Sequence, residues 1–280
     1  MTTVEVTDKV KKSLVKLVVV DNKTGKILSQ GSGVVVSDLG FILTAYHVVS
    51  SMASNSNIIA MAIPYSGSGS KYYSLIFGGI SFEIRDQNYI KPTVVDLAIL
   101  SPLQKNSIPP IPLREDIPRE GTEIIMAGFP EDLKAPLDIS EKFDKNTVGG
   151  QNNLMKIQEF SNYIIPWIMV KHGIIGGVFH IVTPEMKTEL FGELKSFSLQ
   201  AAEYWIDNTY AKGASGGPVV DMDGNLLGII TERGETYESD FMETIRFPVP
   251  SGTVRILSHK LITWSLEELK RVWKPPYSDI

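Results

Sequence analysis

The chain has 280 residues, 43% apolar and 21% charged, so it can bury the core of one large globular domain. Its formal net charge of −5 argues against the basic face that nucleic-acid binders build from clustered Lys and Arg. The absence of cysteine excludes disulfides and thiolate metal sites.

Short strand-like runs separated by turn signals dominate the chain, and this pattern favours barrels or sandwiches over alternating strands and helices. A proline-rich segment at 109–112 predicts a crossing between two groups of strands. The first group is expected at 14–20, 26–30, 33–37, 41–45, 58–63, 74–77 and 97–100. The second group is expected at 123–128, 173–182, 195–200, 218–222 and 226–231. We therefore predict an all-β fold with one barrel in 1–112 and another in 113–250.

The last residues, 251–280, change to helical spacing. Ser265 and Glu268 form a capping-box pattern, and two prolines at 275–276 end the pattern. In a helix, Val254, Leu257, Leu261 and Ile262 would lie on one face, and so would Leu266, Leu269 and Trp273. We expect two amphipathic helices that pack against the barrels.

The segment 131–167 is long for a loop between strands. It has partial helical spacing through Leu154, Ile157 and Phe160. Long loops often carry function, so we predict a mobile or regulatory insertion over the cleft between the barrels. An inert surface decoration is the alternative that the sequence leaves open.

Neither a leader nor a membrane span is expected. The first residues include Glu5 and Asp8, and Lys16 interrupts the apolar run at 14–20, which is unlike a signal peptide. The apolar stretch at 163–170 contains Pro166 and is far shorter than the roughly 20 residues of a membrane-spanning helix. These features predict a cytoplasmic location.

A serine between glycines is the first candidate for chemistry. Ser215 lies in the run GASGGP at 213–218, directly before a strand-like segment. Flanking glycines allow the sharp turn that presents a nucleophile and its neighbouring N–H groups to a carbonyl. A lone motif of this kind is also compatible with an ordinary glycine-rich turn.

Two upstream residues supply the partners that a serine nucleophile needs. His47 follows an apolar strand in the run TAYHVV at 44–49, and Asp96 begins the run DLAIL at 96–100. A serine hydroxyl requires a base to accept its proton and a third group that orients the base. The chain order His, Asp, Ser is that of the chymotrypsin arrangement and differs from the order in α/β-hydrolases. Together the three residues predict a catalytic triad.

These motifs resemble the trypsin-like serine protease family, and most closely the protease domain of its Deg/HtrA branch. The similarity covers about 13–262. The matching runs are GSGVVV at 31–36, GFILTAYHVV at 40–49, DLAIL at 96–100, GASGGP at 213–218, DGN at 223–225, LGIIT at 227–231 and FPVPSGTV at 247–254.

The resemblance implies two six-stranded antiparallel β-barrels of the chymotrypsin type, with C-terminal helices and a serine endopeptidase site between the barrels. His47 would act as general base and then general acid, Asp96 would orient its ring, and Ser215 would attack the peptide carbonyl. The N–H groups of Gly213 and Ser215 would bind the oxyanion. No cofactor and no metal are expected, and the four histidines form no H-E-x-x-H pair.

The resemblance also implies how polypeptide substrates are held. The residues expected to contact substrate are Thr209, Lys212, Ile230, Thr231, Glu232 and Arg233. The strand ending near Thr231 would pair with the backbone of an extended or unfolded chain. Thr209 would form the floor of the pocket for the side chain before the cut. We expect small or medium apolar side chains there and no Arg or Lys, because a basic guest would lose hydration without a carboxylate partner, unless Asp207 turns into the pocket.

Two departures from the family pattern bear on these expectations. Ala214 precedes the serine where relatives carry Asn or Asp, so no new amino terminus can form an ion pair there and activation by clipping is not expected. The hairpin and closing helices use most of the residues after Ser215, so no PDZ-like domain is expected.

Two other functions remain open on the sequence. A proteolytically silent module could keep the cleft for peptide capture, because a fold does not fix a function. An esterase could use the same acyl chemistry. A homo-oligomer is also open, since Deg-type relatives are often trimers.

Overall fold

The structure is a computed structural model, and it describes residues 1–65, 69–86, 89–105, 107–130, 167–182, 186–190, 193–197, 200–239 and 246–273. The segment expected to form an insertion, 131–167, lies outside the described residues except for Trp167. The side chain of Arg233 is likewise outside the description.

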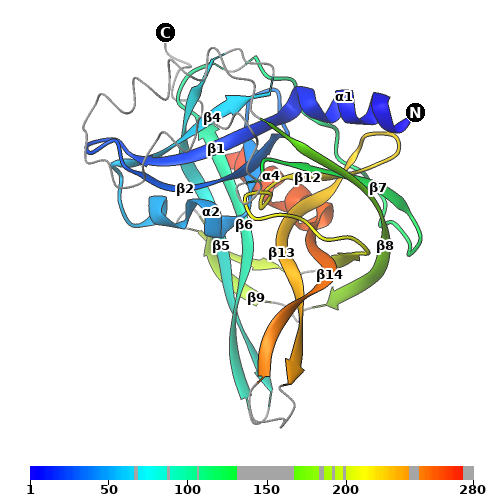
Figure 1. Cartoon of the computed structure of the whole chain (residues 1–280). Helices are drawn as coiled ribbons and strands as arrows, with labels where there is room; N and C mark the ends of the chain where they lie inside the picture. The colour runs from blue at the N-terminus through cyan, green and yellow to red at the C-terminus, as the bar shows by residue number, and fades with distance from the viewer. Residues whose placement is uncertain are drawn as a thin grey trace.

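The first group of strands closes into a six-stranded antiparallel barrel, drawn in blue and cyan in Figure 1. Its order is β1-β2-β3-β6-β5-β4. The strands are β1 (Leu14–Asp21), β2 (Ile27–Val35), β3 (Ile42–Thr44), β4 (Ile58–Pro64), β5 (Lys71–Asp86) and β6 (Tyr89–Pro102). The runs expected at 26–30 and 33–37 are one continuous strand, β2, because the glycines between them stay extended.

The second group closes into another six-stranded barrel, with the order β11-β14-β13-β12-β7-β8. Its strands are β7 (Glu123–Gly128), β8 (Met169–Val182), β11 (Gln200–Ile206), β12 (Pro218–Asp221), β13 (Leu226–Ser239) and β14 (Arg246–Ser258). A separate hairpin consists of β9 (Met186–Leu190) and β10 (Glu193–Phe197). The predicted all-β architecture of two antiparallel barrels is confirmed. The strand expected at 195–200 is instead divided between β10 and β11.

Helices are few. The main ones are α1 (Thr3–Ser13) and α4 (His259–Val272), with the single turns α2 (Tyr46–Val49) and η1 (Ser50–Ala53) after β3. The sequence analysis placed helical spacing from Val254 onward, and this was wrong for the first part because residues up to Ser258 belong to β14. One C-terminal helix is described where two were expected.

The helix α1 begins at a capping box. The Glu5 N–H donates to the Thr2 hydroxyl at 3.3 Å, and the Thr2 N–H donates to the Glu5 carboxylate at 2.7 Å. Val6 and Val10 of α1 are buried. Lys9 donates to the Asp223 carbonyl in the β12–β13 turn at 2.9 Å, so the helix that leads into the first barrel is anchored on the second.

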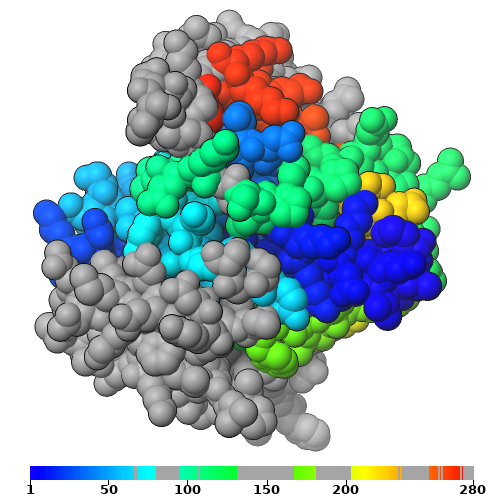
Figure 2. All heavy atoms as spheres, turned by 90° about the horizontal axis from the view of Figure 1, so that it is seen from above, coloured from blue at the N-terminus to red at the C-terminus, as the bar shows by residue number. Residues whose placement is uncertain are grey.

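The two barrels and both long helices share one apolar core. It joins Val10 of α1, Leu43 of β3, Ile125 of β7, Val220 of β12 and Leu261 of α4. Figure 2 shows α1 in dark blue and the segment after β6 in green on one face, with α4 in red beyond them. This shared core fixes the barrels relative to each other, which a site between them requires.

Candidate active site

His47 lies on the short helix α2, which begins two residues after the end of β3. Ile42 to Thr44 are buried in the first barrel, and Val48 and Val49 anchor α2 against its core. The His47 side chain therefore faces outward and is 53% exposed.

Asp96 lies in β6 at a bulge in the barrel. The pairing of β5 with β6 passes from Gly78–Ala98 to Ile80–Val95, so Asp96 and Leu97 together face Gly79. Such bulges redirect side chains next to functional sites. Leu97 is fully buried, whereas the Asp96 side chain is 23% exposed.

A pair of glycines makes room for this arrangement. Gly79 has a φ of 57°, and a Cβ added there would lie 3.0 Å from the Tyr46 ring. A Cβ on Gly78 would lie 2.8 Å from the same ring. The ring of Tyr46 thus fills the space that side chains at both positions would need. This Gly-Gly pair is a signal that the sequence analysis did not use.

The His47 and Asp96 side chains meet directly. Nδ1 of His47 lies 2.7 Å from Oδ2 of Asp96, and the backbone N–H of His47 donates to Oδ1 at 2.8 Å. Because a carboxylate only accepts hydrogen bonds, Nδ1 carries the proton and Nε2 of a neutral ring is left as an acceptor. The two contacts therefore set both the orientation and the tautomer of the ring.

The charge state of His47 follows from its neighbours. The hydrogen bond to Asp96 raises the pKa of His47, and the negative charges of Asp96 and Glu232 raise it further. Partial burial opposes these effects but does not reverse them.

Ser215 lies in a turn between the barrels, where glycines have conformations that other residues rarely adopt. Gly213 has a φ of 90° and Gly216 a φ of 83°. The Gly216 N–H donates to the Ile230 carbonyl at 2.7 Å, and the Ile230 N–H donates to the Gly217 carbonyl at 2.9 Å. These bonds hold the turn on β13.

Ser32 of β2 holds the same turn on the first barrel. Its N–H donates to the Ser215 carbonyl at 2.9 Å, and its hydroxyl donates to the Gly213 carbonyl at 2.9 Å. The hydroxyl also accepts the Phe129 N–H at 2.9 Å, and the Ser32 carbonyl accepts the Thr44 hydroxyl at 2.8 Å. Ser32 is fully buried, so every one of these bonds is shielded from water. The sequence analysis missed this role, although the GSG run at 31–33 was noted.

Within the described residues, the hydroxyl of Ser215 and the N–H groups expected to bind the oxyanion form no hydrogen bond. In the part of the chain that the structure describes, no hydrogen bond joins Ser215 to the His47 ring. The N–H groups of Gly213 and Ser215 also donate to no described residue. They are therefore available to a substrate oxygen.

The predicted substrate strand, β13, is only partly paired by its neighbour β12 among the described residues. β12 pairs with β13 only as far as Ile229, whereas β14 pairs with β13 along its length to Ser239. From Thr231 onward, therefore, β12 forms no pairing with the side of β13 that faces away from β14. Ile230 and Thr231 are themselves buried, at 4% and 6% exposure, whereas Glu232, the next residue along the strand, is exposed. Long outer halves of β13–β14 and of β5–β6 extend beyond the barrels (Figure 1).

The other residues expected to contact substrate are distributed around the Ser215 turn. Glu232 is exposed, and its carboxylate lies 2.7 Å from Nη2 of Arg255. Lys212 is exposed. The Thr209 N–H donates to the Asn208 side chain at 2.8 Å, and the Thr209 carbonyl accepts Nζ of Lys171 at 2.5 Å. Lys171 was not singled out from the sequence.

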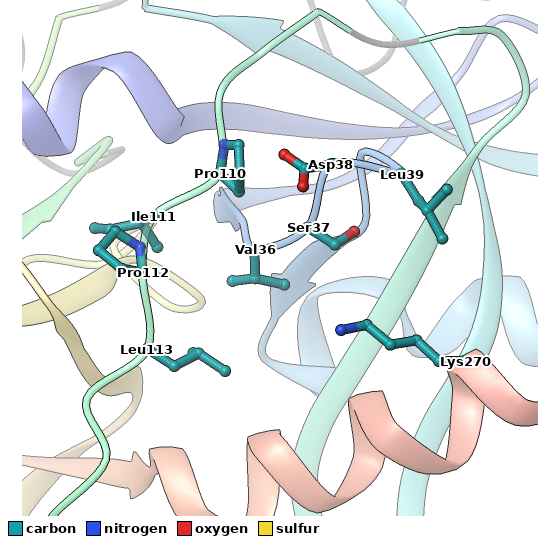
Figure 3. A pocket seen from close by; sticks show the side chains of 9 residues that line it. All are labelled: Val36, Ser37, Asp38, Leu39, Pro110, Ile111, Pro112, Leu113 and Lys270. Atoms are coloured by element: carbon teal, nitrogen blue, oxygen red, sulfur yellow. The ribbon is translucent and has the colours of Figure 1, made fainter.

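A groove elsewhere on the molecule contains none of these residues. It lies between the β2–β3 turn, the segment after β6 and α4, with Lys270 reaching in from the helix (Figure 3). Among the described residues, no group of three or more His, Cys, Asp or Glu side chains could hold a metal. No described helix is long and apolar enough to cross a membrane.

Comparison with known families decides the identity of this arrangement. Residues 31–229 match the family model of the trypsin-like peptidase domain, a span that includes His47, Asp96 and Ser215. The chain belongs to the trypsin-like peptidase family. The resemblance recognised from its motifs is confirmed at this level, and by family the chain is a serine peptidase.

The fold of this trypsin-like peptidase is shared with a solved enzyme structure. The crystal structure of the serine endoprotease from Yersinia pestis matches it with a TM-score of 0.56 over 97% of this chain and 68% of that chain. The sequences are 20% identical, so the match shows a common fold. No curated protein matches this trypsin-like peptidase significantly.

The raised pKa of His47 predicts the pH dependence of this trypsin-like peptidase. His47 can accept a proton only when neutral, so kcat/KM should fall below a midpoint that lies above the ordinary histidine pKa of 6.5. Glu232→Gln removes one of the negative charges and should move the midpoint to lower pH, whereas Glu267→Gln on the exposed face of α4 should not. A pH–rate profile of each protein checks this.

The same shift has a consequence for stability, with a defined sign. A pKa raised in the folded state means that folding stabilises the protonated ring. This contribution is fully present below the unfolded pKa and is lost as pH rises through the folded pKa. Because the His47 side chain is 53% exposed, solvent and salt weaken the effect.

Proposed function

We propose that this chain is an endopeptidase that hydrolyses peptide bonds through Ser215, His47 and Asp96. The observation that carries the proposal is that two hydrogen bonds join His47 to Asp96. Nδ1 of His47 lies 2.7 Å from Oδ2 of Asp96, and the backbone N–H of His47 donates to Oδ1 at 2.8 Å. This pair leaves Nε2 of His47 as the free base, and the pKa of the ring is raised. The glycine-flanked Ser215 turn supports the remaining member of the triad.

The reaction would proceed in two halves. Ser215 Oγ attacks the peptide carbonyl carbon while its proton passes to Nε2 of His47, and the carbonyl oxygen becomes negatively charged. The N–H groups of Gly213 and Ser215 stabilise this oxyanion. His47 then gives the proton to the leaving nitrogen, and the C–N bond breaks to leave an acyl-enzyme. Water, deprotonated by His47, attacks the ester carbon, and the proton returns to Ser215 as the ester bond breaks.

The substrate would be an extended polypeptide. Among the described residues β12 leaves one side of β13 unpaired from Thr231 onward, so a substrate strand can add there by backbone hydrogen bonds. Backbone pairing reads extension more than sequence, so unfolded or exposed segments suit it best.

Digestion of an unfolded protein tests this function. Reduced casein incubated with the wild-type chain should give peptides that mass spectrometry can assign, and Ser215→Ala should give none above background. Equal digestion by the two proteins would mean that Ser215 is not the nucleophile.

A peptide-binding module without chemistry is the second candidate, because no hydrogen bond joins Ser215 to the His47 ring among the described residues. Catalytic hydrogen bonds are often long before substrate binds, so this geometry does not exclude activity. Labelling by a fluorophosphonate separates the two candidates. The endopeptidase is labelled at Ser215 and the silent module is not.

A further inference from the structure

A lysine occupies the inner face of the second barrel beside the serine turn. Lys171 of β8 pairs with Met126 of β7, and Met126 points into the barrel core. Residues that face each other across two strands, and residues two apart on one strand, share a face. Met169 and Ile175, on the same face of β8, also pack in this core. Lys171 is therefore a partly buried cation among apolar side chains.

The ammonium group of Lys171 reaches the loop that precedes the nucleophile. It donates to the Thr209 carbonyl at 2.5 Å and lies 5.8 Å from the centre of the Tyr210 ring. The Tyr210 ring and Ala214 belong to the same apolar cluster, so this core continues to the residue before Ser215. The ammonium group thus contacts Thr209, which lies six residues before the nucleophile in the loop that leads to it.

No negative group neutralises Lys171 within the described residues. Lys171 forms no ion pair with any described carboxylate. Burial raises the pKa of Tyr210, so its phenol stays neutral near pH 7. Asp207, the carboxylate closest in sequence to Thr209, is exposed. It lies beside Gly176, with its Cβ 3.7 Å from the position that a Cβ on Gly176 would occupy. An ammonium has three donors, and the Thr209 carbonyl uses one of them.

We propose that Lys171 is a specificity-determining residue that favours an acidic side chain, glutamate above all, immediately before the scissile bond. This inference rests on the proposed endopeptidase function and on Thr209 forming the floor of the pocket for that side chain. Partly buried charges are normally paired, and a guest carboxylate would supply the missing partner. A basic guest would be repelled.

The proposal changes the expectation drawn from the sequence. Without Lys171, a pocket ending in Thr209 predicts apolar guests and rejects Arg and Lys. With Lys171, the rejection of basic guests gains a second cause, whereas an apolar guest would leave the ammonium without a counter-charge. The two expectations are distinguished by comparing cleavage after Glu, after its neutral near-isostere Gln and after the apolar Met.

The test uses peptides that differ only in the residue before the cut. We expect wild-type kcat/KM for Glu to exceed that for Gln by about 10-fold, because a charge-assisted hydrogen bond is about twice as strong as a neutral one. Lys171→Met should abolish this preference and improve cleavage after Met. Lys23→Met, which removes the same charge on an exposed turn, should keep the wild-type order. Equal rates for Glu and Gln with the wild-type protein would overturn the proposal, and so would an unchanged Glu preference in Lys171→Met.

A binding measurement separates this inference from the catalytic one. Fluorescent product peptides that end in Glu, Gln or Met are titrated against Ser215→Ala and against the double variant with Lys171→Met. Tighter binding of the Glu peptide that needs Lys171 supports the inference even if the wild-type chain cleaves nothing and resists the fluorophosphonate. Equal binding of all three refutes it even in an active peptidase. Thermal unfolding checks that Lys171→Met is folded, and Lys171→Gln replaces it if not.

Discussion

Replacing Ser215 by alanine is expected to lower kcat/KM for peptide cleavage by at least about 10³-fold with the fold intact, because members of a triad act as a unit. His47→Ala should cost a similar factor. Ser215 is only partly buried and His47 is 53% exposed, so neither change removes a core side chain. Steady-state kinetics with a fixed peptide measure the loss, and circular dichroism confirms the fold.

Asp96→Asn should be nearly as damaging, for a reason that the geometry makes specific. The backbone N–H of His47 needs an acceptor at Oδ1, so the amide oxygen of the variant would take that place. The amide NH₂ would then face Nδ1, which must become the acceptor. The ring proton moves to Nε2, and His47 can no longer accept the proton of Ser215.

Matched controls remove the same chemical groups at exposed positions. Ser56→Ala and His180→Ala change side chains that face solvent and should leave kcat/KM near the wild-type value. Wild-type activity in Ser215→Ala, His47→Ala or Asp96→Asn would end the triad assignment.

The catalytic candidates could be predicted from the sequence because each lies in a local motif. The residues of these motifs indicate the backbone conformation that the site requires. Gly213 and Gly216 flank Ser215 and both have positive φ, as a sharp turn requires. The pairing of His47 with Asp96 across 49 residues followed only from their order. What could not be predicted is how Asp96 is aimed, because the bulge opposite Gly79 depends on the register of β5 against β6.

The helix boundaries show where periodicity fails. Val254 and Ile256 face the core of the second barrel, whereas Leu257 faces the core between the barrels. A strand buried on both faces has apolar residues at intervals of one to three, and these imitate the spacing of a helix. The helix α1 was missed for a different reason, since its Thr2–Glu5 capping box was present but stood before a short apolar strand.

Lys171 escaped the sequence analysis because a lysine in a strand usually marks a solvent face. Its neighbours gave no contrary sign, since the inward alternation of β8 passes from Met169 through Lys171 to Gly173 and Ile175. The contact with Thr209 joins residues 38 apart in the chain, and only the closure of the barrel brings them together. Substrate preference is therefore the part of the function that the sequence alone predicts least well.

The second large effect is expected from a single methyl group at Gly216. A Cβ there would overlap the Ser32 carbonyl oxygen and the Thr44 hydroxyl, and would lie 2.9 Å from Cα of Thr44. Ser32 and Thr44 both belong to the first barrel, which also carries His47. Relief of the clash must therefore push the Ser215 turn away from His47, and a displacement of about 1 Å can cost about 10²-fold in rate.

Gly121→Ala is the matched control. Gly121 and Gly216 have the same backbone conformation, but they differ in the room available for a Cβ atom. Gly121 has a φ of 82° and Gly216 a φ of 83°, but a Cβ on Gly121 would meet nothing within 4 Å. Gly121→Ala should lower the free energy of unfolding by about 1 kcal/mol, the cost of a left-handed backbone for alanine. Gly216→Ala adds overpacking to the same backbone strain and should lower the free energy of unfolding by about 3 kcal/mol.

Urea unfolding and peptide kinetics on both variants test this comparison. Gly121→Ala should keep kcat/KM near the wild-type value, whereas Gly216→Ala should lose at least about 10²-fold under conditions in which it remains folded. Such a loss would show that contact with the first barrel positions the nucleophile. Equal destabilisation by the two substitutions, with Gly216→Ala still active, would mean that the turn yields without moving Ser215, and the proposed role of Ser32 in holding it would be wrong.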